Sequence, residues 1–218
     1  MRGVGDARCV DQDTSIARVE ADTEDLLPAI LCQANVGDDK AVRAMVARCR
    51  EELGGLDVLV NNAATTRFID HTKLEDLTDE VWDELFGVNL KGAFWCCRAA
   101  MPLLQERGGS IVNVTSVAGL SGQGSSMVYA ASKAALNCLT KSLARAFGPK
   151  VRVNAVAPGP VLTRWLTDHM DRVAQSLPIT PMGRAAIPED IADAVSFLSL
   201  GTTLMTGQVV VVDGGRTM

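Results

Sequence analysis

Short apolar runs alternate with helical patterns along most of this 218-residue chain, and that alternation constrains the fold more than any other feature. The run at 56–60 is almost continuously apolar and ends at the turn-forming pair Asn61-Asn62. A strand of this kind is typical of a parallel sheet covered on both faces. Since parallel strands need crossover connections, usually helices, the pattern predicts an α/β fold with a doubly wound parallel sheet.

The same reasoning places the other elements along the chain. Further strands are predicted at 7–10, 29–36, 110–115, 151–156 and 208–212. Helices are predicted at 14–27, between Gly37 and Gly54, at 79–105 with a bend near Gly92 and Pro102, at 127–147 and at 188–200. The polar segments 61–64, 116–124 and 158–163 each follow a strand, so we expect them to share the carboxyl edge of the sheet, where such folds bind ligands.

Composition narrows the class of protein. With 47% hydrophobic residues the chain is not of the disordered type, and its length suits a single domain spanning 1–218. The net charge of −5 and the lack of a basic block argue against a nucleic-acid or anionic-membrane partner. No apolar run approaches about 18 residues and no secretory leader is evident, so a cytoplasmic protein is expected. The six scattered cysteines are interpreted as buried reduced thiols, the two histidines as surface residues, and no metal site is predicted.

The segment YAASK carries the first chemical signal. Tyr129 and Lys133 are four residues apart, so they lie on one face of the predicted helix. An ammonium near a phenol favours the phenolate and brings its pKa closer to neutrality. Ser116, at the end of the strand before this helix, can offer a hydroxyl to a substrate oxygen at the same edge. On its own, a tyrosine and a lysine at this spacing fit an exposed polar face of an ordinary helix as well as they fit a catalytic site.

Several further motifs occur in a fixed order with Tyr129. They are NNAA at 61–64, VNLKG at 88–92, Thr115-Ser116, YAASK at 129–133, RVNAVAPG at 152–159 with Thr163, and GQVVVVDGG at 207–215. From Asn35 to the C-terminus the chain resembles the short-chain dehydrogenase/reductase family, with features similar to 3-oxoacyl-carrier-protein reductases. The resemblance implies a Rossmann-like fold and an NAD(P)-dependent oxidoreductase that interconverts a ketone or aldehyde and an alcohol.

That resemblance implies a catalytic tetrad of Asn89, Ser116, Tyr129 and Lys133. Tyr129 would be the general acid in carbonyl reduction and the base in alcohol oxidation. Lys133 would lower the pKa of Tyr129 and bind the nicotinamide ribose, and Ser116 would polarise the carbonyl. Asn89 would hold a water that links Lys133 to solvent.

The resemblance also assigns residues to the cofactor. Asn35 and Val36 match a pair that contacts adenine, although the family usually has Asp where Asn35 stands. Asn62 and Ala63 would approach the adenosine side, whereas Pro158, Gly159 and Thr163 would hold the nicotinamide. Tyr129 and Lys133 would complete this set.

One family motif is not found at the N-terminus. The family opens with a strand, a glycine-rich turn and a helix that binds the pyrophosphate, and MRGVGDA does not have this pattern. We interpret the chain as N-terminally truncated, while two alternatives stay open: a sheet that closes differently, or a partner chain that supplies the strand. Asp13, or less well Asp11, falls where an acidic residue binds the adenosine ribose, which favours NAD over NADP.

Two functions are weighed against each other. The first is the oxidoreductase acting on a small carbonyl or alcohol substrate, whose apolar lining would come from 161–182 through Trp165, Leu166, Met170 and Met182, although these side chains are equally suited to packing. The alternative is a cofactor-deficient, inactive binding or regulatory protein. By the same resemblance a homo-oligomer, a dimer or a homotetramer, is expected through the helices at 79–105 and 127–147.

Overall fold

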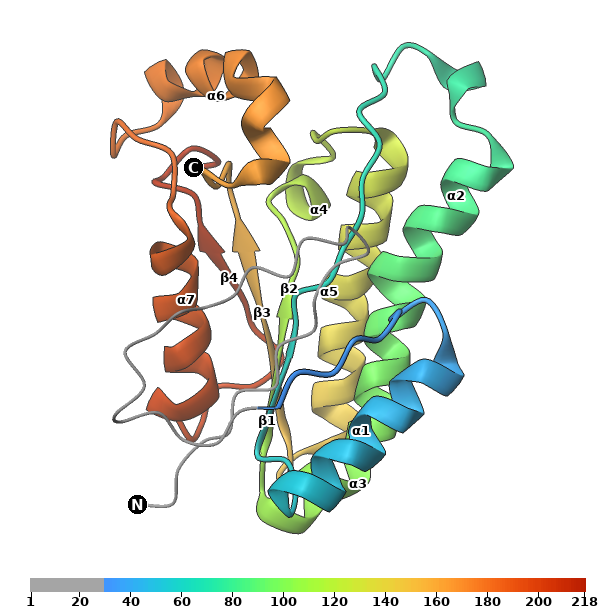
Figure 1. The fold of residues 1–218 in the computed structure, drawn as a ribbon. Helices are drawn as coiled ribbons and strands as arrows, with labels where there is room; N and C mark the ends of the chain where they lie inside the picture. The colour runs from blue at the N-terminus through green and yellow to red at the C-terminus, as the bar shows by residue number, and fades with distance from the viewer. Residues whose placement is uncertain (1–29) are drawn as a thin grey trace.

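The computed structural model describes residues 30–218 (Figure 1). The strand predicted at 7–10, the helix predicted at 14–27 and Asp13 lie outside the described residues.

Four parallel strands form the sheet within the described part of the chain. They are β1 (Val58–Asn61), β2 (Ser110–Val114), β3 (Arg152–Pro158) and β4 (Val209–Val212), in the spatial order β1-β2-β3-β4. Val60 pairs with Val112, and Val156 pairs with Val210. The α/β fold with a parallel sheet is therefore confirmed, and each of these strands begins within two residues of its predicted start.

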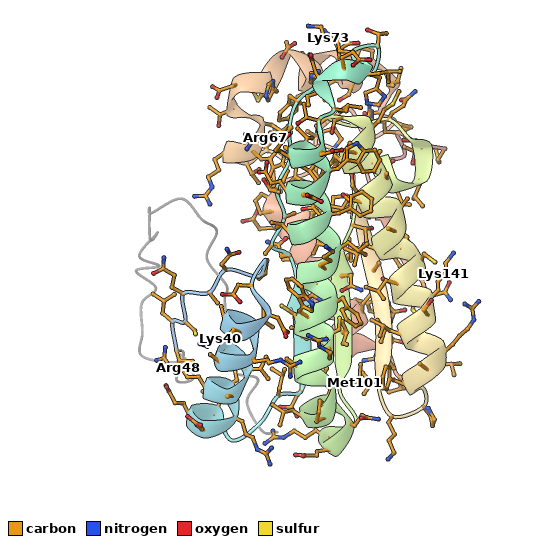
Figure 2. The ribbon with its side chains drawn as sticks, turned by 90° about the vertical axis from the view of Figure 1, so that its right-hand side faces the viewer. Lys40, Arg48, Arg67, Lys73, Met101 and Lys141 are labelled. Atoms are coloured by element: carbon orange, nitrogen blue, oxygen red, sulfur yellow. The ribbon has the colours of Figure 1, made fainter. Side chains whose placement is uncertain are left out.

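Helices cover both faces of this sheet, as parallel sheets require. The helices α1 (Asp39–Leu53), α3 (Ala93–Arg107) and α5 (Met127–Phe147) stand side by side on one face, as Figure 2 shows, and α7 (Pro188–Ser196) covers the other. Met101, Ile111 and Val153 belong to the core between the sheet and the first group. Val112 and Val156 point to the opposite face, where they pack with Leu198, just after α7. Because apolar residues of β2 and β3 point to both faces, both strands are mostly apolar rather than alternating between apolar and polar.

The long helical stretch before β2 is interrupted once. Helix α2 (Asp79–Phe86) passes into a π-helical turn (Gly87–Gly92) and then into α3. The bend predicted near Gly92 coincides with the end of this turn, where a Cβ atom would lie 2.9 Å from the backbone oxygen of Val36. Pro102 is inside α3 and does not end the helix. Helix α3 continues to Arg107, stabilised by its packing against the sheet.

The strand predicted at 29–36 is wrong for its described part. Residues 30–36 form no strand, and within residues 30–218 no strand pairs with them. Their polar groups bond locally instead. The backbone N–H of Gly37 donates to Asn35 Oδ1 at 2.8 Å, and Arg48 donates to the backbone oxygen of Leu31 at 2.9 Å. Apolar alternation alone cannot form a strand, because a strand also needs a neighbour for its backbone hydrogen bonds.

Between β3 and α7 the chain makes a long excursion over the carboxyl edge of the sheet. It contains a 3₁₀ helix (Arg164–His169), α6 (Met170–Ser176) and a second 3₁₀ turn (Leu177–Ile179). Its two ends are joined where the N–H of Leu162 donates to the oxygen of Ala186 at 2.8 Å. We call residues 163–182 the lid segment.

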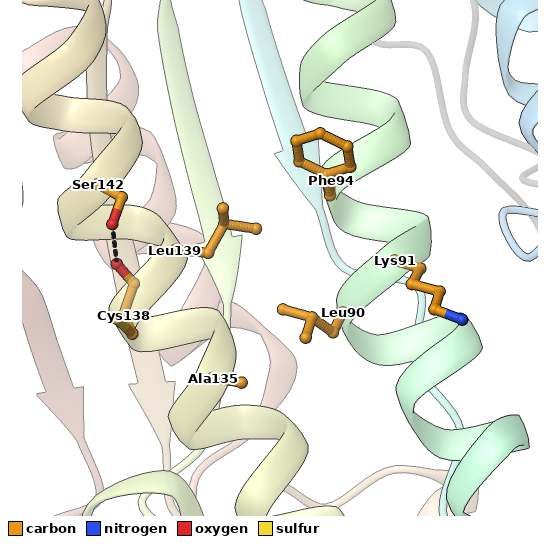
Figure 3. A pocket seen from close by; sticks show the side chains of 7 residues that line it. All are labelled: Leu90, Lys91, Phe94, Ala135, Cys138, Leu139 and Ser142. Atoms are coloured by element: carbon orange, nitrogen blue, oxygen red, sulfur yellow. Dashed lines mark hydrogen bonds between the residues drawn. The ribbon is translucent and has the colours of Figure 1, made fainter.

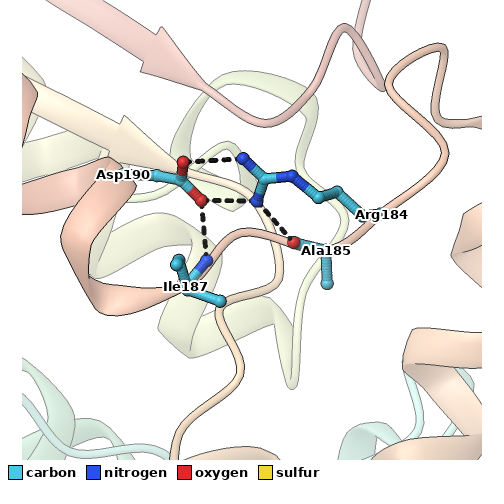
Figure 4. Close-up of polar contacts among 4 residues, drawn as sticks. All are labelled: Arg184, Ala185, Ile187 and Asp190. Carbon is cyan, nitrogen blue, oxygen red and sulfur yellow. Dashed lines mark hydrogen bonds and ion pairs between the residues drawn. The ribbon is translucent and has the colours of Figure 1, made fainter.

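The far end of this excursion is fixed by an ion pair (Figure 4). Arg184 contacts both carboxylate oxygens of Asp190, at 2.6 and 2.8 Å, and Asp190 also accepts from the N–H of Ile187 at 2.8 Å. Asp190 thereby caps α7, and the adjacent guanidinium lowers the pKa of its carboxyl.

Three shorter helical elements complete the described part of the chain: a 3₁₀ helix at Leu74–Asp76, α4 at Ala118–Ser121 and a second π-helical turn at Phe197–Gly201, directly after α7. Within residues 30–218 no helix combines the length and the apolar character needed to cross a membrane.

Helix α4 approaches α5 so closely that only a glycine fits at the contact. A Cβ atom on Gly119 would lie 2.7 Å from the backbone nitrogen of Ala134. We therefore expect Gly119→Ala to lower the free energy of unfolding by about 1–3 kcal/mol, measured by urea denaturation. Gly87→Ala is the matched control, since Gly87 has a helical backbone with open space around it. That variant should be unchanged or up to about 1 kcal/mol more stable. Equal effects of the two substitutions would contradict the steric argument.

Candidate active site

Four strands end at one edge of the sheet, and the loops that follow them gather there. Ser116 comes two residues after β2, and its position is fixed by its neighbours. The N–H of Thr115 donates to the oxygen of Val156 at 2.7 Å, and the N–H of Val117 donates to the oxygen of Pro158 at 3.0 Å. The chain around Ser116 is therefore bound on both sides to β3.

Tyr129 lies in the first turn of α5 and meets Ser116 at this edge. The hydroxyl of Ser126 caps the helix by accepting from the N–H of Tyr129 at 3.2 Å. Burial raises the pKa of the Tyr129 phenol, and the nearby Ser116 hydroxyl opposes that rise. Part of the Tyr129 surface stays accessible, as proton exchange with a ligand requires.

Lys133 lies one helical turn after Tyr129, and its ammonium is buried with 2% of the residue exposed. Nζ donates to the backbone oxygen of Val114 at 2.9 Å and lies 5.8 Å from the centre of the Tyr129 ring. Because burial disfavours the charged form, the pKa of Lys133 is lowered to about 8. An ammonium has three N–H groups, and within the described chain one protein oxygen accepts from it. Two donors are thus left for a ligand.

Asn89 lies in the π-helical turn, and its side-chain amide bonds to protein groups that the sequence did not predict. Its Oδ1 accepts from the N–H of Thr65 at 2.8 Å, and its Nδ2 donates to the oxygen of Thr65 and to Ser132 Oγ, both at 3.0 Å. Ser132 in turn donates to the oxygen of Tyr129 at 2.8 Å. The Asn89 side chain thus connects the loop after β1 to the helix that carries Tyr129.

The residues expected at the cofactor are placed as follows. Asn62 and Ala63 directly follow β1, Pro158 ends β3, and Gly159 and Thr163 begin the excursion above the sheet. A Cβ atom on Gly159 would lie 2.8 Å from the Cβ of Asp213, so the approach of the chain after β4 requires glycine there.

Asn35 and Val36 are distant in sequence from the other residues expected at the cofactor, but they lie at the same end of the fold. Val36 packs against Gly92, and Gly37 lies near Val88, both in the π-helical turn that contains Asn89. The Asn35 side chain is bonded to the backbone of its own turn.

A buried amide network beneath the site was not predicted. Asn61 Nδ2 donates to Asn113 Oδ1 at 2.8 Å and to Cys97 Sγ at 3.2 Å, and Asn113 Nδ2 donates to Thr140 Oγ1 at 2.9 Å. The network joins β1, β2, α3 and α5. Three asparagines in otherwise apolar strands, at 61, 113 and 154, were the sequence signal that could have revealed such contacts.

We expected every cysteine to be buried and both histidines to lie on the surface, and the structure differs from this in part. Cys49, Cys96 and Cys97 are buried, and burial raises the pKa of the Cys97 thiol to about 12, whereas Cys138 is exposed. His169 stacks on Phe68 with ring centres 3.6 Å apart, so it is a packing residue and not simply a surface one. Within residues 30–218 no group of His, Cys, Asp and Glu is arranged to hold a metal ion.

A parallel sheet with helices on both faces is a class of α/β fold that binds ligands at the carboxyl ends of its strands, which is where Ser116, Tyr129 and the buried Lys133 lie. A family model described as enoyl-(acyl carrier protein) reductase matches residues 7–217. The chain belongs to the short-chain dehydrogenase/reductase family of oxidoreductases.

Individual relatives agree with this assignment. A Streptomyces violaceoruber protein, named as a ketoacyl reductase of the granaticin polyketide synthase, is 42% identical over 216 residues, which are 97% of this chain and 84% of that protein. The 3-oxoacyl-[acyl-carrier-protein] reductase FabG of Thermotoga maritima is 39% identical over 83% of this chain and 74% of its own. The solved structure of ElxO with NADP bound has a TM-score of 0.80 and 31% identity, covering 86% of this chain and 78% of that one.

The buried ammonium of Lys133 leads to a prediction on stability and pH. An exposed lysine has a pKa of about 10.4, so between about pH 8 and 10.4 the unfolded chain keeps a proton that the folded chain has released. The free energy of unfolding therefore rises with pH through this window, and below it the buried charge imposes its full cost. We expect Lys133→Met to be about 1–3 kcal/mol more stable than the wild type at pH 7, with the difference vanishing towards pH 10.5.

Urea denaturation at a series of pH values between 7 and 10.5 measures this effect. Lys141→Met is the matched control, because Lys141 lies on the same helix but is exposed (Figure 2). Its effect should be small at every pH. A Lys133→Met protein that is less stable at pH 7, or whose difference from the wild type does not change with pH, would refute the assignment of a destabilising buried charge.

Proposed function

We propose that this chain transfers a hydride between NAD(P)H and a carbonyl substrate, with Tyr129 as the general acid in reduction and the base in oxidation. The observation that supports it best is the convergence of Ser116, Tyr129 and Lys133 at one edge of the sheet, where the Lys133 ammonium lies 5.8 Å from the centre of the Tyr129 ring. When bound, the nicotinamide supplies the hydride, so the protein has to orient the carbonyl and deliver one proton.

The described residues fit the nicotinamide half of such a cofactor. The buried Lys133 ammonium has two N–H groups that are suited to the hydroxyls of a ribose. Pro158, Gly159 and Thr163 would hold the nicotinamide beside it, and Asn62 and Ala63 the adenosine side. Asn35 and Val36 would contact adenine. The preference for NAD rests on Asp13, whose carboxylate would repel the 2′-phosphate of NADP.

The proton path is proposed to run from Tyr129 to the substrate oxygen. Ser116 donates to or accepts from the same oxygen and keeps the carbonyl in line with the phenol. Burial raises the pKa of Tyr129 and the Ser116 hydroxyl opposes that rise, and at neutral pH a positive charge on Lys133 would favour the phenolate further. Asn89 positions the loop after β1 relative to α5 through its bonds to Thr65 and Ser132. The proposal also includes a water held by Asn89 that links Lys133 to solvent.

Replacing the phenol tests the assignment of Tyr129. Tyr129→Phe should lower kcat for ketone reduction by about 10²- to 10⁴-fold, since it removes the general acid. Its affinity for NADH and for NADPH, measured by cofactor fluorescence, should change less than about twofold. Residual activity within a few-fold of the wild type would refute the role of Tyr129. Failure of the wild type to bind either cofactor at millimolar concentration would instead support a cofactor-deficient binding or regulatory protein.

Tyr129 is the only tyrosine of the chain, so its ionisation can be read directly from phenolate absorbance. In the folded wild type the pKa should lie above the ordinary value. In Lys133→Met this pKa should be almost unchanged, because Lys133 has already released its proton at the pH where the phenol ionises, and a large change would contradict this order of ionisation.

We also propose a homo-oligomer, a dimer or a tetramer. An apolar groove of about 400 Å³ runs along the outer faces of α3 and α5 (Figure 3). It is lined by Leu90, Lys91, Phe94, Ala135, Cys138, Leu139 and Ser142. A second apolar surface follows α7, where Phe197, Leu200 and Leu204 are 52%, 62% and 91% exposed. Two separate apolar surfaces suit a tetramer built from two kinds of two-fold interface.

A charge placed in the groove should disrupt such an assembly. We expect Phe94→Glu to halve the mass in solution, measured by light scattering after gel filtration, because a carboxylate would be buried without a partner. Leu74→Glu is the control, since Leu74 is 61% exposed and lies outside both surfaces. A wild type that is monomeric, or a Phe94→Glu protein of unchanged mass, would contradict the use of this groove.

A further inference from the structure

A small cavity of about 210 Å³ opens beside Tyr129 at the carboxyl edge of the sheet. Its lining residues are Ala64, Thr65, Thr66, Phe68 and Trp165. The first four belong to the chain after β1, and Trp165 belongs to the lid segment. The ring centres of Trp165 and Tyr129 are 6.4 Å apart. The cavity, which we call the aromatic slot, thus begins next to the phenol proposed to deliver the proton.

The polar side chains around the aromatic slot are already engaged within the protein. Thr65 Oγ1 donates to Glu84 Oε1 at 3.3 Å, and the hydroxyl of Thr66 is hydrogen-bonded to that of Ser125. Arg67 is paired with the same Glu84 at 2.9 Å. The threonine hydroxyls are thus already bonded within the protein, and the Phe68 and Trp165 rings are the apolar surface that the slot offers, beside polar surface, to an uncharged ligand.

The outer wall of the slot is held in place by packing between two separate segments. Phe68 lies against the ring of His169, at 3.6 Å between centres and an interplanar angle of 31°. The guanidinium of Arg172 lies 5.3 Å from the centre of the same Phe68 ring. The aromatic walls on the two sides are thus connected to each other before any ligand arrives, which lowers the cost of binding a rigid ring.

The charge around the opening does not favour an anionic ligand. Residues 164–172 of the lid segment carry two basic and two acidic side chains: Arg164, Arg172, Asp168 and Asp171. Opposite charges interspersed in this way give no net attraction for a negatively charged substrate.

We propose that the aromatic slot binds the ring system of a free, uncharged aromatic cyclic ketone, and that Trp165 selects for it by stacking. This inference rests on the proposed carbonyl reduction. The carbonyl oxygen lies at Tyr129 and Ser116, and the fused rings extend along Trp165 towards Phe68. Flat rings contact the indole over a whole face, whereas a flexible alkyl chain must be ordered first.

Two ketones of equal carbon number test the inference: 2-tetralone, which has a fused aromatic ring, and the linear 2-decanone. In Trp165→Leu we expect kcat/KM for 2-tetralone to fall about tenfold, with less than about a threefold change for 2-decanone. Trp165→Phe should restore most of the loss. Trp82→Leu is the control, because Trp82 stacks on Phe86 in α2 and does not line the slot, and it should leave both ketones unaffected. Urea denaturation verifies that each variant is folded.

A second measurement separates this inference from the proposed function. Calorimetric binding of 2-tetralone without turnover should be about tenfold weaker in Trp165→Leu than in the wild type. If neither ketone is reduced although cofactor binds, the proposed function fails, and this binding difference still decides the role of the slot. Equal losses for both ketones, or equal binding of 2-tetralone to wild type and Trp165→Leu, would overturn the inference.

Discussion

The buried ammonium of Lys133 is the constraint around which this end of the fold is arranged. It has one described protein acceptor, the oxygen of Val114, and burial alone lowers its pKa to about 8. A charge held in this way costs stability, so packing elsewhere must offset it. Helix α5 does so by burying Leu136, Leu143 and Ala144 against neighbouring elements. The close approach of α4 at Gly119 encloses the backbone of Lys133 from another side.

Side-chain amides hold the loops at the carboxyl edge of the sheet in position. Asn61 and Asn113 join β1 to β2 below the site, and Asn89 joins the loop after β1 to α5 through Thr65 and Ser132. Each amide both donates and accepts, so a single side chain can fix a backbone segment that lacks a regular partner. Hydrogen bonds in such buried places are costly to leave unmade. The loops around the proposed substrate position are therefore set by these amides, although the loops themselves are irregular.

Sequence reasoning succeeded where local pattern and burial agree. The apolar runs of β2 and β3 and the whole of α5 were located to within two residues, because strands covered on both faces and a capped helix have strong local signals. It failed where the outcome depends on a distant partner. Residues 30–36 have the alternation of a strand but no pairing neighbour in the described chain.

In the candidate site, too, features set by residues close in sequence could be predicted, whereas contacts between distant residues could not. The spacing of Tyr129 and Lys133 on one helix is a local property, so their common face could be predicted. The contacts of Asn89 could not, because neither Thr65 nor Ser132 is near it in sequence.

The aromatic slot, proposed to set substrate specificity, also depends on residues that are far apart in the sequence. Its walls come from segments about a hundred residues apart, the loop after β1 and the lid segment, which meet where Phe68 contacts His169 and Arg172. Reaction chemistry in such a fold depends on residues at strand and helix ends, which the sheet holds rigidly. In the proposed site, substrate choice would depend on the excursion above the sheet, whose base is closed by Leu162 and Ala186. A change in the lid segment can therefore alter which ketone is bound while the serine, tyrosine and lysine stay in place.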